Sequence, residues 1–219
     1  MISRLNKNWP AQRALKTHGG ITLFIFILVV FLSCAPSKDK SLSNAPGKTS
    51  SPAEKKIILP AFELPVPQNE QEKSYLGVTG SGTFTVSQIN SPVLIIEVFN
   101  MYCPHCQRSA PLVNELYQTI QSRADVKGKI KIIGLGIGNS PYEVDLFKKK
   151  YEVPFPLFPD HDGAICKPFG VLSTPTFIGA KINRDGTIEQ FYFKPGELHD
   201  IANFLTEIIQ LSGLEQENK

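Results

Sequence analysis

The spacing of apolar residues predicts alternating strands and helices in the part of the chain that follows residue 57. The run Val93–Phe99 is almost entirely apolar and rich in β-branched residues, which predicts a buried central strand. Residues 107–120 and 197–211 carry apolar side chains at helical spacing, which predicts two amphipathic helices. Strands and helices that alternate in this way are typical of an α/β domain.

Shorter patterns predict the remaining elements. Residues 83–86 alternate like an edge strand placed before the central strand, and 129–137 has the pattern of a second buried strand. A helix is predicted over 142–151 and a short strand over 155–158. Because the sequence contains no internal repeat and no second set of such elements, one domain is expected over 57–219.

Residues 1–34 have the layout of a secretory signal, with four cations before the apolar run 21–32 and no acidic residue before Asp39. Removing these cations from the 23 Lys and Arg leaves 19 against 20 Asp and Glu, a net charge of −1. The excess positive charge therefore belongs to the leader, and no nucleic-acid partner is predicted. The four cations are Arg4, Lys7, Arg13 and Lys16.

The leader ends in Phe31-Leu32-Ser33-Cys34, which resembles a bacterial lipobox whose cysteine is lipidated and becomes the new N-terminus. Two other interpretations stay open: cleavage after Ala35, or retention of the apolar run as a short anchor helix. All three place the domain outside the cytoplasm, in the periplasm or cell envelope, and lipidation of Cys34 would attach it to a membrane. Residues 35–56 contain almost no large apolar side chain and are predicted to form a flexible tether.

The tetrad Cys103-Pro104-His105-Cys106 stands where the central strand gives way to a helix. Unpaired amides and the helix dipole favour an anion there, so we expect Cys103 to be a nucleophile with a lowered pKa. Cys106 lies one turn further along the helix and can resolve a mixed disulfide. Pro104 is tolerated in a first turn, and His105 is expected to add to thiolate stabilisation. The tetrad predicts a redox-active disulfide, Cys103–Cys106, and no other cofactor.

Other sites built on two cysteines fit the sequence less well. Structural zinc needs a second ligand pair at matching spacing, which the chain does not have. Attachment of a c-type haem needs a histidine directly after the second cysteine, where Gln107 stands. The glycines of 134–138 resemble a dinucleotide-binding loop but lack the third glycine, so we interpret them as a strand end built from small residues. No metal site is predicted.

These features resemble the thioredoxin-fold disulfide oxidoreductases over roughly the last 160 residues, the size of one domain. Glu97 stands six residues before Cys103, where the family has a buried acid that shuttles the proton of the second cysteine. The segment Ser173-Thr174-Pro175-Thr176-Phe177 resembles the family's cis-proline loop, which receives the backbone of a client. Pro111 matches the proline of the active-site helix, and 183–186 resembles the turn between the last two strands.

The resemblance implies a thioredoxin fold, with a central mixed β-sheet flanked by helices. The 69 positions from Cys106 to Pro175 suit the short inserted segment of TlpA-like and ResA-like proteins, whereas the Cys-Pro-His-Cys tetrad is similar to that of the DsbA oxidases. The implied activity is disulfide exchange with client proteins that contain cysteines, and a membrane or periplasmic redox partner would reset the site. Tyr102, Thr174 and Pro175 are expected to contact the client. The direction of electron flow stays open.

Some observations stay outside this picture. Cys166 is interpreted as a buried side chain of a helix face, because isolated buried cysteines usually behave as small hydrophobes.

Two functions of other classes stay open. One is delivery of copper or another metal through Cys103, Cys106 and a histidine. The other is a peroxiredoxin-like peroxidase, although the residues before Cys103 lack the Pro and Thr that resemble the peroxide site of that family.

Overall fold

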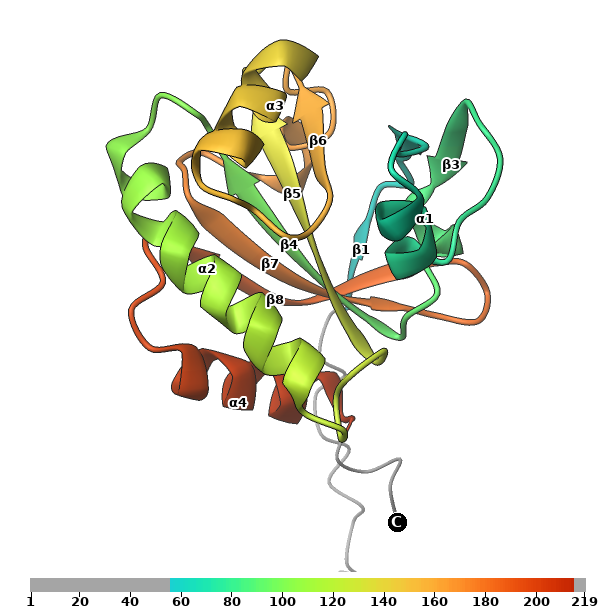
Figure 1. Ribbon diagram of the computed structural model, residues 1–219. Helices are drawn as coiled ribbons and strands as arrows, with labels where there is room; N and C mark the ends of the chain where they lie inside the picture. Colours follow the sequence, from blue (N-terminus) through green and yellow to red (C-terminus); the bar gives the residue numbers. More distant parts are fainter. Residues whose placement is uncertain (1–55, 215–219) are drawn as a thin grey trace, which may run out of the picture. The chain divides into compact units, whose positions relative to one another are not determined.

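The computed structural model describes residues 56–214, so the leader, Cys34 and nearly all of the predicted tether lie outside the described residues. A six-stranded mixed sheet forms the centre of this part, in the order β1-β8-β7-β4-β5-β6 (Figure 1). The strands β4, β5 and β6 are parallel, while β7 is antiparallel to β4, and β8 is antiparallel to both β7 and β1. The strands are β1 (Ile57–Leu59), β4 (Val93–Phe99), β5 (Ile130–Ile137), β6 (Leu157–Asp160), β7 (Thr176–Ile182) and β8 (Ile188–Pro195).

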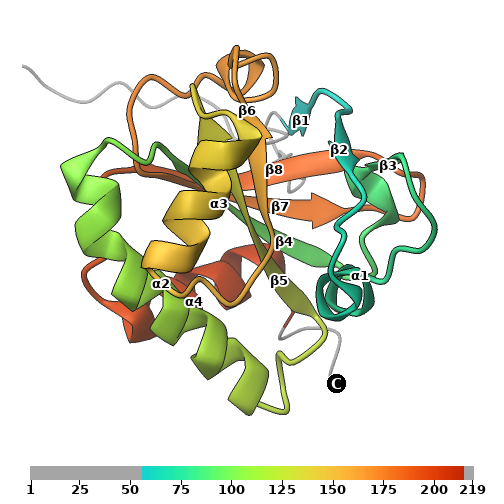
Figure 2. The ribbon, with the colours of Figure 1, turned by 45° about the horizontal axis from the view of Figure 1, so that its top comes forward.

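Both faces of this sheet are covered. One core packs residues of α2, α3 and α4 against the sheet, and a second core lies under the segment that carries α1 and the small β2–β3 sheet (Figure 2). The elements outside the main sheet are α1 (Glu70–Leu76), α2 (Pro104–Ser122), α3 (Pro141–Lys150), α4 (Ile201–Ser212), β2 (Glu63–Pro65), β3 (Thr83–Thr85) and the 3-10 turns η1 (Val86–Gln88) and η2 (Lys167–Phe169). Across residues 56–214, no helix combines the length and the apolar character needed to cross a bilayer.

The strand β4 is buried along its whole length because it lies inside the sheet, between the two cores. Its side chains alternate: Ile95 and Phe99 belong to the core under α2, and Ile96 belongs to the opposite core. The glycines of β5 make room for this packing, since a Cβ at Gly136 would lie 2.8 Å from Val144 Cγ2 and 3.2 Å from Phe99. The glycine run of β5 therefore serves close packing beside Phe99.

The predicted C-terminal helix begins later than expected. The pattern predicts a helix over 197–211, but α4 begins at Ile201, and Glu197 lies in the loop that follows β8. Gly196 adopts a φ of 102°, which only glycine adopts readily, and the Asp200 side chain accepts the Asn203 N–H as the N-cap. The spacing of apolar residues carries no information about the turn at Gly196 or the N-cap at Asp200, so the start of the helix was predicted too early.

Three further elements differ from the sequence prediction. The strand expected over 155–158 is β6, two residues further along, and β3 pairs with β2 outside the main sheet. The helix α1 was not predicted from the sequence. This helix has clear end signals, because the Asn69 side chain accepts the Gln71 N–H and Gly77 ends the helix in the left-handed conformation. Its seven residues are too few to show a helical period.

Candidate active site

The order of strands brings four connections to one end of the sheet. Because β4 and β7 are antiparallel, the residue Val98 near the end of β4 pairs with Thr176 at the start of β7. In the same way, Thr176 pairs with Pro195 at the end of β8, while β5 runs parallel to β4 and ends beside it. The loops before α2, before β7, after β5 and after β8 therefore meet, and the predicted site residues lie among them.

The two cysteines of the tetrad differ strongly in exposure. Cys103 is the partly exposed N-cap of α2, Pro104 is its first helical residue, and Cys106 in the first turn is fully buried. The Cys103 Sγ lies 3.2 Å from the Thr174 carbonyl oxygen, next to a cis peptide bond between Thr174 and Pro175. The structure thus brings the first thiol against the loop expected to receive a client.

The two thiols also differ in their electrostatic environment. Burial acts to raise the pKa of Cys103, but hydrogen bonds with the Thr174 side chain, with the backbone amides of Cys106 and His105 and with the Cys106 thiol outweigh it and leave the pKa below its ordinary value. Burial raises the pKa of Cys106 to about 12. Near neutral pH the exposed sulfur is therefore the better nucleophile, and the buried one keeps its proton.

Glu97 lies in the middle of the sheet, only 3% exposed. It pairs in register with Phe177 on β7 and stands two residues from both Ile95 and Phe99, so its side chain is on the same face of the sheet as theirs, the face covered by α2. Its Oε1 atom has no hydrogen-bond partner among the described residues, and burial raises the pKa of this carboxyl to about 8. Cys106 is part of the core on the same face.

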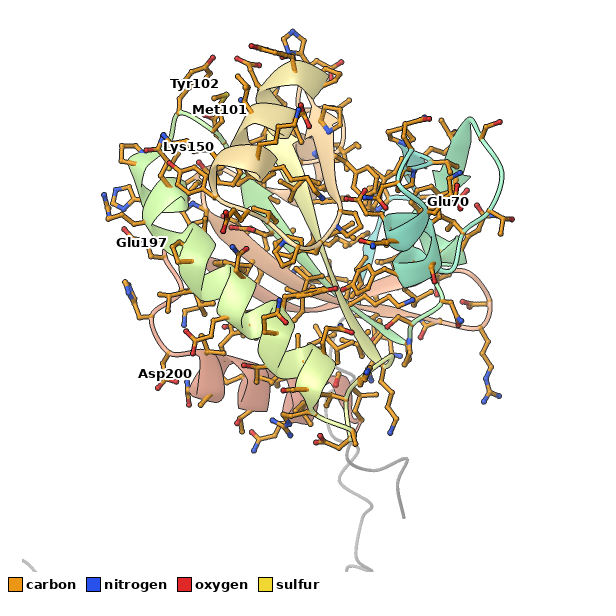
Figure 3. The ribbon with its side chains drawn as sticks, in the orientation of Figure 1. Glu70, Met101, Tyr102, Lys150, Glu197 and Asp200 are labelled. Carbon is orange, nitrogen blue, oxygen red and sulfur yellow. The ribbon has the colours of Figure 1, made fainter. Side chains whose placement is uncertain are left out.

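The loop before Cys103 is held by side-chain amides on both sides. Asn139 Oδ1 accepts the Met101 N–H at 2.8 Å, and Gln107 Nε2 donates to the Met101 carbonyl oxygen at 2.8 Å. Asn100 Oδ1 accepts the Tyr102 N–H, and Asn100 Nδ2 donates to the Ile137 carbonyl oxygen at the end of β5. Figure 3 labels Met101 and Tyr102 in this loop. These bonds fix the approach of the chain to Cys103.

A cleft of about 370 Å³ opens beside Cys103. Tyr102 on its rim is 65% exposed and donates its hydroxyl hydrogen to Glu143 at the start of α3, while Leu172 is 98% exposed. Such exposed apolar side chains beside a reactive sulfur are a surface on which another chain can pack. The cleft is lined by Asn100, Tyr102, Cys103, Ile137, Val171, Leu172, Ser173 and Thr174.

The ring of His105 contacts two charged side chains outside the tetrad. The ring nitrogen Nδ1 contacts the carboxylate of Glu197, and Arg108 Nη2 lies 2.8 Å from the same nitrogen. Arg108 Nη2 also donates to Glu197 Oε1 at 2.6 Å. The contribution of His105 to the pKa of Cys103 comes from its backbone amide.

Two other predicted features have clear positions in the structure. Cys166 is fully buried beside Asp160, whose carboxylate accepts the Cys166 N–H at 2.9 Å, and burial raises the pKa of this thiol. Pro111 lies inside α2, which continues past it. Within residues 56–214, no group of three or more His, Cys, Asp and Glu side chains is arranged to hold a metal ion.

The polar side chains that surround the tetrad were not predicted as site residues. Asn100, Asn139 and Glu197 each follow a strand that ends at the site, but only the strand order reveals that these ends meet. Arg108 and Gln107 lie in the predicted helix, and their role depends on partners far along the chain. For Asn100 the sequence offers one signal, a polar residue directly after the buried strand β4.

We expect Asn139→Ala to lower the free energy of unfolding by about 1 to 2 kcal/mol, because it leaves the Met101 N–H without its acceptor. Urea unfolding monitored by circular dichroism measures the effect. Asn183→Ala is the control, since it removes an amide that bonds Thr187 in the β7–β8 turn. Equal losses in the two variants would contradict a special role for the Asn139 contact.

Comparison with known proteins places the chain in a family. The sequence model of the AhpC/TSA family matches residues 58–191, more than half of the chain. A protein named thiol-disulfide oxidoreductase ResA, from Bacillus thuringiensis subsp. konkukian, is 29% identical over 97 residues, which cover 44% of this chain and 52% of that protein. The protein of the same name from Geobacillus thermodenitrificans is 23% identical over 115 residues, which cover 52% and 62%. The chain thus spans less than two thirds of the length of these relatives.

Solved structures show the same fold. A solution structure described as a thioredoxin from Neisseria meningitidis superposes with a TM-score of 0.52 at 20% identity, covering 70% of this chain and 88% of that one. A crystal structure described as the thiol:disulfide interchange protein DsbE from Chlorobium tepidum gives 0.52 at 18% identity, covering 71% and 94%. The predicted thioredoxin-like fold, with a mixed sheet flanked by helices, is confirmed, and the chain belongs to the AhpC/TSA family.

Proposed function

We propose that the protein is a thiol-disulfide oxidoreductase that exchanges disulfides with client proteins through Cys103 and Cys106. The observation that carries this proposal is the contrast between the two thiols. One sulfur is partly exposed at a helix N-terminus and has a lowered pKa, and the other is buried one turn away with a pKa of about 12. A nucleophile beside a protected resolving thiol is the arrangement that two-step disulfide exchange requires.

In the reducing direction, disulfide exchange takes place in two steps. The Cys103 thiolate attacks one sulfur of a client disulfide, that bond breaks, and the other client sulfur leaves and takes up a proton. Cys106 then gives its proton to Glu97 and attacks the Cys103 sulfur. The bond between Cys103 and the client breaks, and the client sulfur leaves as a thiolate that takes up a proton from solvent, to which Glu97 later releases its own. Two electrons have passed to the client, and a Cys103–Cys106 disulfide remains. The same steps in reverse oxidise a client, and a partner with its own thiols or disulfide resets the site.

The client is proposed to bind in extended form along the cis-proline loop. The Thr174 backbone lies next to the Cys103 sulfur, and the adjacent cleft carries the exposed side chains of Tyr102 and Leu172. Backbone pairing with this loop would accept many sequences, because main-chain groups are common to all of them. Apolar contact with the rim of the cleft would add affinity.

The proposed location is outside the cytoplasm, with attachment to a membrane through a lipid on Cys34. This part of the proposal depends on the leader sequence, whose cations, apolar run and lipobox-like tetrapeptide lie outside the described residues. The mature domain would then work on the flexible tether 35–56. Mass spectrometry of the protein isolated from bacterial membranes tests for the lipid on Cys34.

We expect Cys106→Ala to form a stable mixed disulfide with a peptide that contains one disulfide, because the first step remains and the resolving thiol is absent. Cys103→Ser is expected to form none, although Cys106 is still present. Non-reducing electrophoresis and mass spectrometry detect the adduct, and Cys166→Ala is the matched control, which should behave like the wild type.

Other results would favour another function. Disulfide reduction that persists in Cys103→Ser contradicts the assignment of the nucleophile. Peroxide turnover that needs Cys103 and is much faster than exchange with disulfides would support the peroxidase alternative. Copper that stays bound at one ion per reduced chain, and is lost in Cys103→Ser, would support metal delivery.

A further inference from the structure

Glu197 joins two side chains of the active-site helix. Its Oε1 atom accepts a hydrogen bond from Arg108 Nη2 at 2.6 Å and contacts His105 Nδ1. Figure 3 labels Glu197 beside α2, although Glu197 belongs to the loop between β8 and α4. We call these three residues, His105, Arg108 and Glu197, the Glu197 cluster. The cluster includes a residue of the redox tetrad itself.

The loop that carries Glu197 is fixed on both sides. The Gly196 N–H donates to the Pro175 carbonyl oxygen at 2.8 Å, which links this loop to the cis-proline loop. Leu198 is 3% exposed and belongs to the core under α2. The Glu197 side chain is 19% exposed, whereas those of His105 and Arg108 are 60% and 56% exposed. The carboxylate is therefore held in place under its two partners.

The charge of the cluster matters because it lies within the first turns of α2, the helix whose N-cap is Cys103. Arg108 contributes a guanidinium, and a positive charge near a thiolate stabilises it. Hydrogen bonds from Arg108 and then from His105 hold the pKa of Glu197 below its ordinary value, so this group is a carboxylate that compensates Arg108. The other titratable groups of the candidate site are Cys106, which hydrogen-bonds Cys103, Glu97 on the strand face covered by α2, and Glu143, which binds Tyr102.

We propose that Glu197 is a positioning residue that engages the His105 ring and the Arg108 guanidinium, and thereby makes the Cys103–Cys106 couple more reducing than the same tetrad without this carboxylate. The proposal deepens the proposed function and rests on it, because it concerns the same dithiol. Without the carboxylate, the charge of Arg108 is uncompensated and the His105 ring is released. Both changes favour the thiolate, which belongs to the reduced form, so the couple becomes more oxidising.

The test is the equilibrium of the full chain with glutathione. The dithiol gives two electrons and two protons to glutathione disulfide, which yields the Cys103–Cys106 disulfide and two glutathione thiols. We expect Glu197→Gln to shift this equilibrium at least tenfold toward the dithiol, which corresponds to about 30 mV. The thiolate absorbance of Cys103 should also appear at lower pH than in the wild type. Glu197→Asp, which keeps the charge, is expected to restore most of the wild-type equilibrium.

A second variant makes the test independent of Glu197→Gln. Arg108→Gln leaves the carboxylate uncompensated, so it is expected to shift the equilibrium in the opposite direction, toward the disulfide. Glu115→Gln is the matched control, because it removes one exposed carboxylate from the same helix without touching the cluster. Circular dichroism shows whether each variant is folded.

Three outcomes would overturn the inference: no shift in Glu197→Gln, equal shifts in Glu197→Gln and Glu115→Gln, or shifts of the same sign in Glu197→Gln and Arg108→Gln. These outcomes leave the proposed function intact as long as the wild type forms its disulfide. If the wild-type chain forms no Cys103–Cys106 disulfide in any glutathione buffer, the proposed function fails, and this inference falls with it.

Discussion

Glu97→Gln is expected to slow the second step of disulfide exchange, the attack by Cys106, by about 100-fold at pH 7, the range typical of removing a general base. With a pKa of about 12, only on the order of 10⁻⁵ of the Cys106 thiol is ionised at pH 7. The buried carboxyl of Glu97, whose pKa is raised to about 8 by burial, can accept this proton, and an amide cannot. The first step, attack by Cys103, should keep nearly its wild-type rate.

Stopped-flow mixing separates the two steps. A peptide disulfide that carries a fluorophore reports formation of the mixed disulfide and then its resolution. In the wild type the resolution rate should rise with pH up to about 8, where Glu97 ionises, and Glu97→Gln should lose this inflection. Glu115→Gln, which removes an exposed carboxylate of α2, is the control. If Glu97→Gln resolves the adduct at the wild-type rate, Glu97 is not the proton acceptor.

The same substitution is expected to stabilise the folded domain at high pH. Burial raises the pKa of Glu97 from 4.5 to about 8, so below pH 4.5 the carboxyl is protonated in both the folded and the unfolded chain. Between pH 4.5 and 8 the unfolded chain releases this proton and the folded domain keeps it, so stability falls as pH rises. Above pH 8 the full penalty remains, roughly 3 to 5 kcal/mol, a large part of the 5 to 15 kcal/mol typical of a domain.

The measurement is the difference in free energy of unfolding between Glu97→Gln and the wild type, from urea titrations at several pH values. The difference should favour the variant increasingly from pH 4.5 to pH 8 and then level off, because all other ionisable groups cancel. The wild type and Glu115→Gln should instead give parallel curves. Parallel curves for Glu97→Gln as well would mean that the buried carboxyl keeps an ordinary pKa in the folded domain. A more stable but slower variant would show that burial of Glu97 serves catalysis at the expense of stability.

The sequence predicts the strands and helices whose apolar pattern is long and continuous. The central strand Val93–Phe99 was predicted with its observed bounds, and the helix after the tetrad was predicted from its apolar period. The short helix α1 was missed because seven residues give no period, and the pairing of β3 with β2 depends on contacts across the fold. The start of α4 was misplaced because the cap at Asp200 and the turn at Gly196 decide it.

The residues of the candidate site also divide into those that local sequence predicts and those that depend on contacts across the fold. The place of Cys103 and Cys106 at a helix start and the burial of Glu97 could be predicted, because they depend on local spacing and on one buried strand. The role of Asn139 and Glu197 could not, since each meets the tetrad only when strands far apart in the sequence are ordered side by side. The direction in which the His105 ring points depends on Glu197, which is 92 positions further along the chain.

The convergence of four loops at one end of the sheet has a consequence for redesign of this protein. Apart from Glu97, the candidate site residues lie in connections or in the first turns of α2, while the folded framework depends on the two cores beneath them. Changes at the exposed side chains of these connections, such as Leu172, should therefore alter the site with little change in foldability, whereas the core residue Leu198 and the N-cap Asp200 have to be kept.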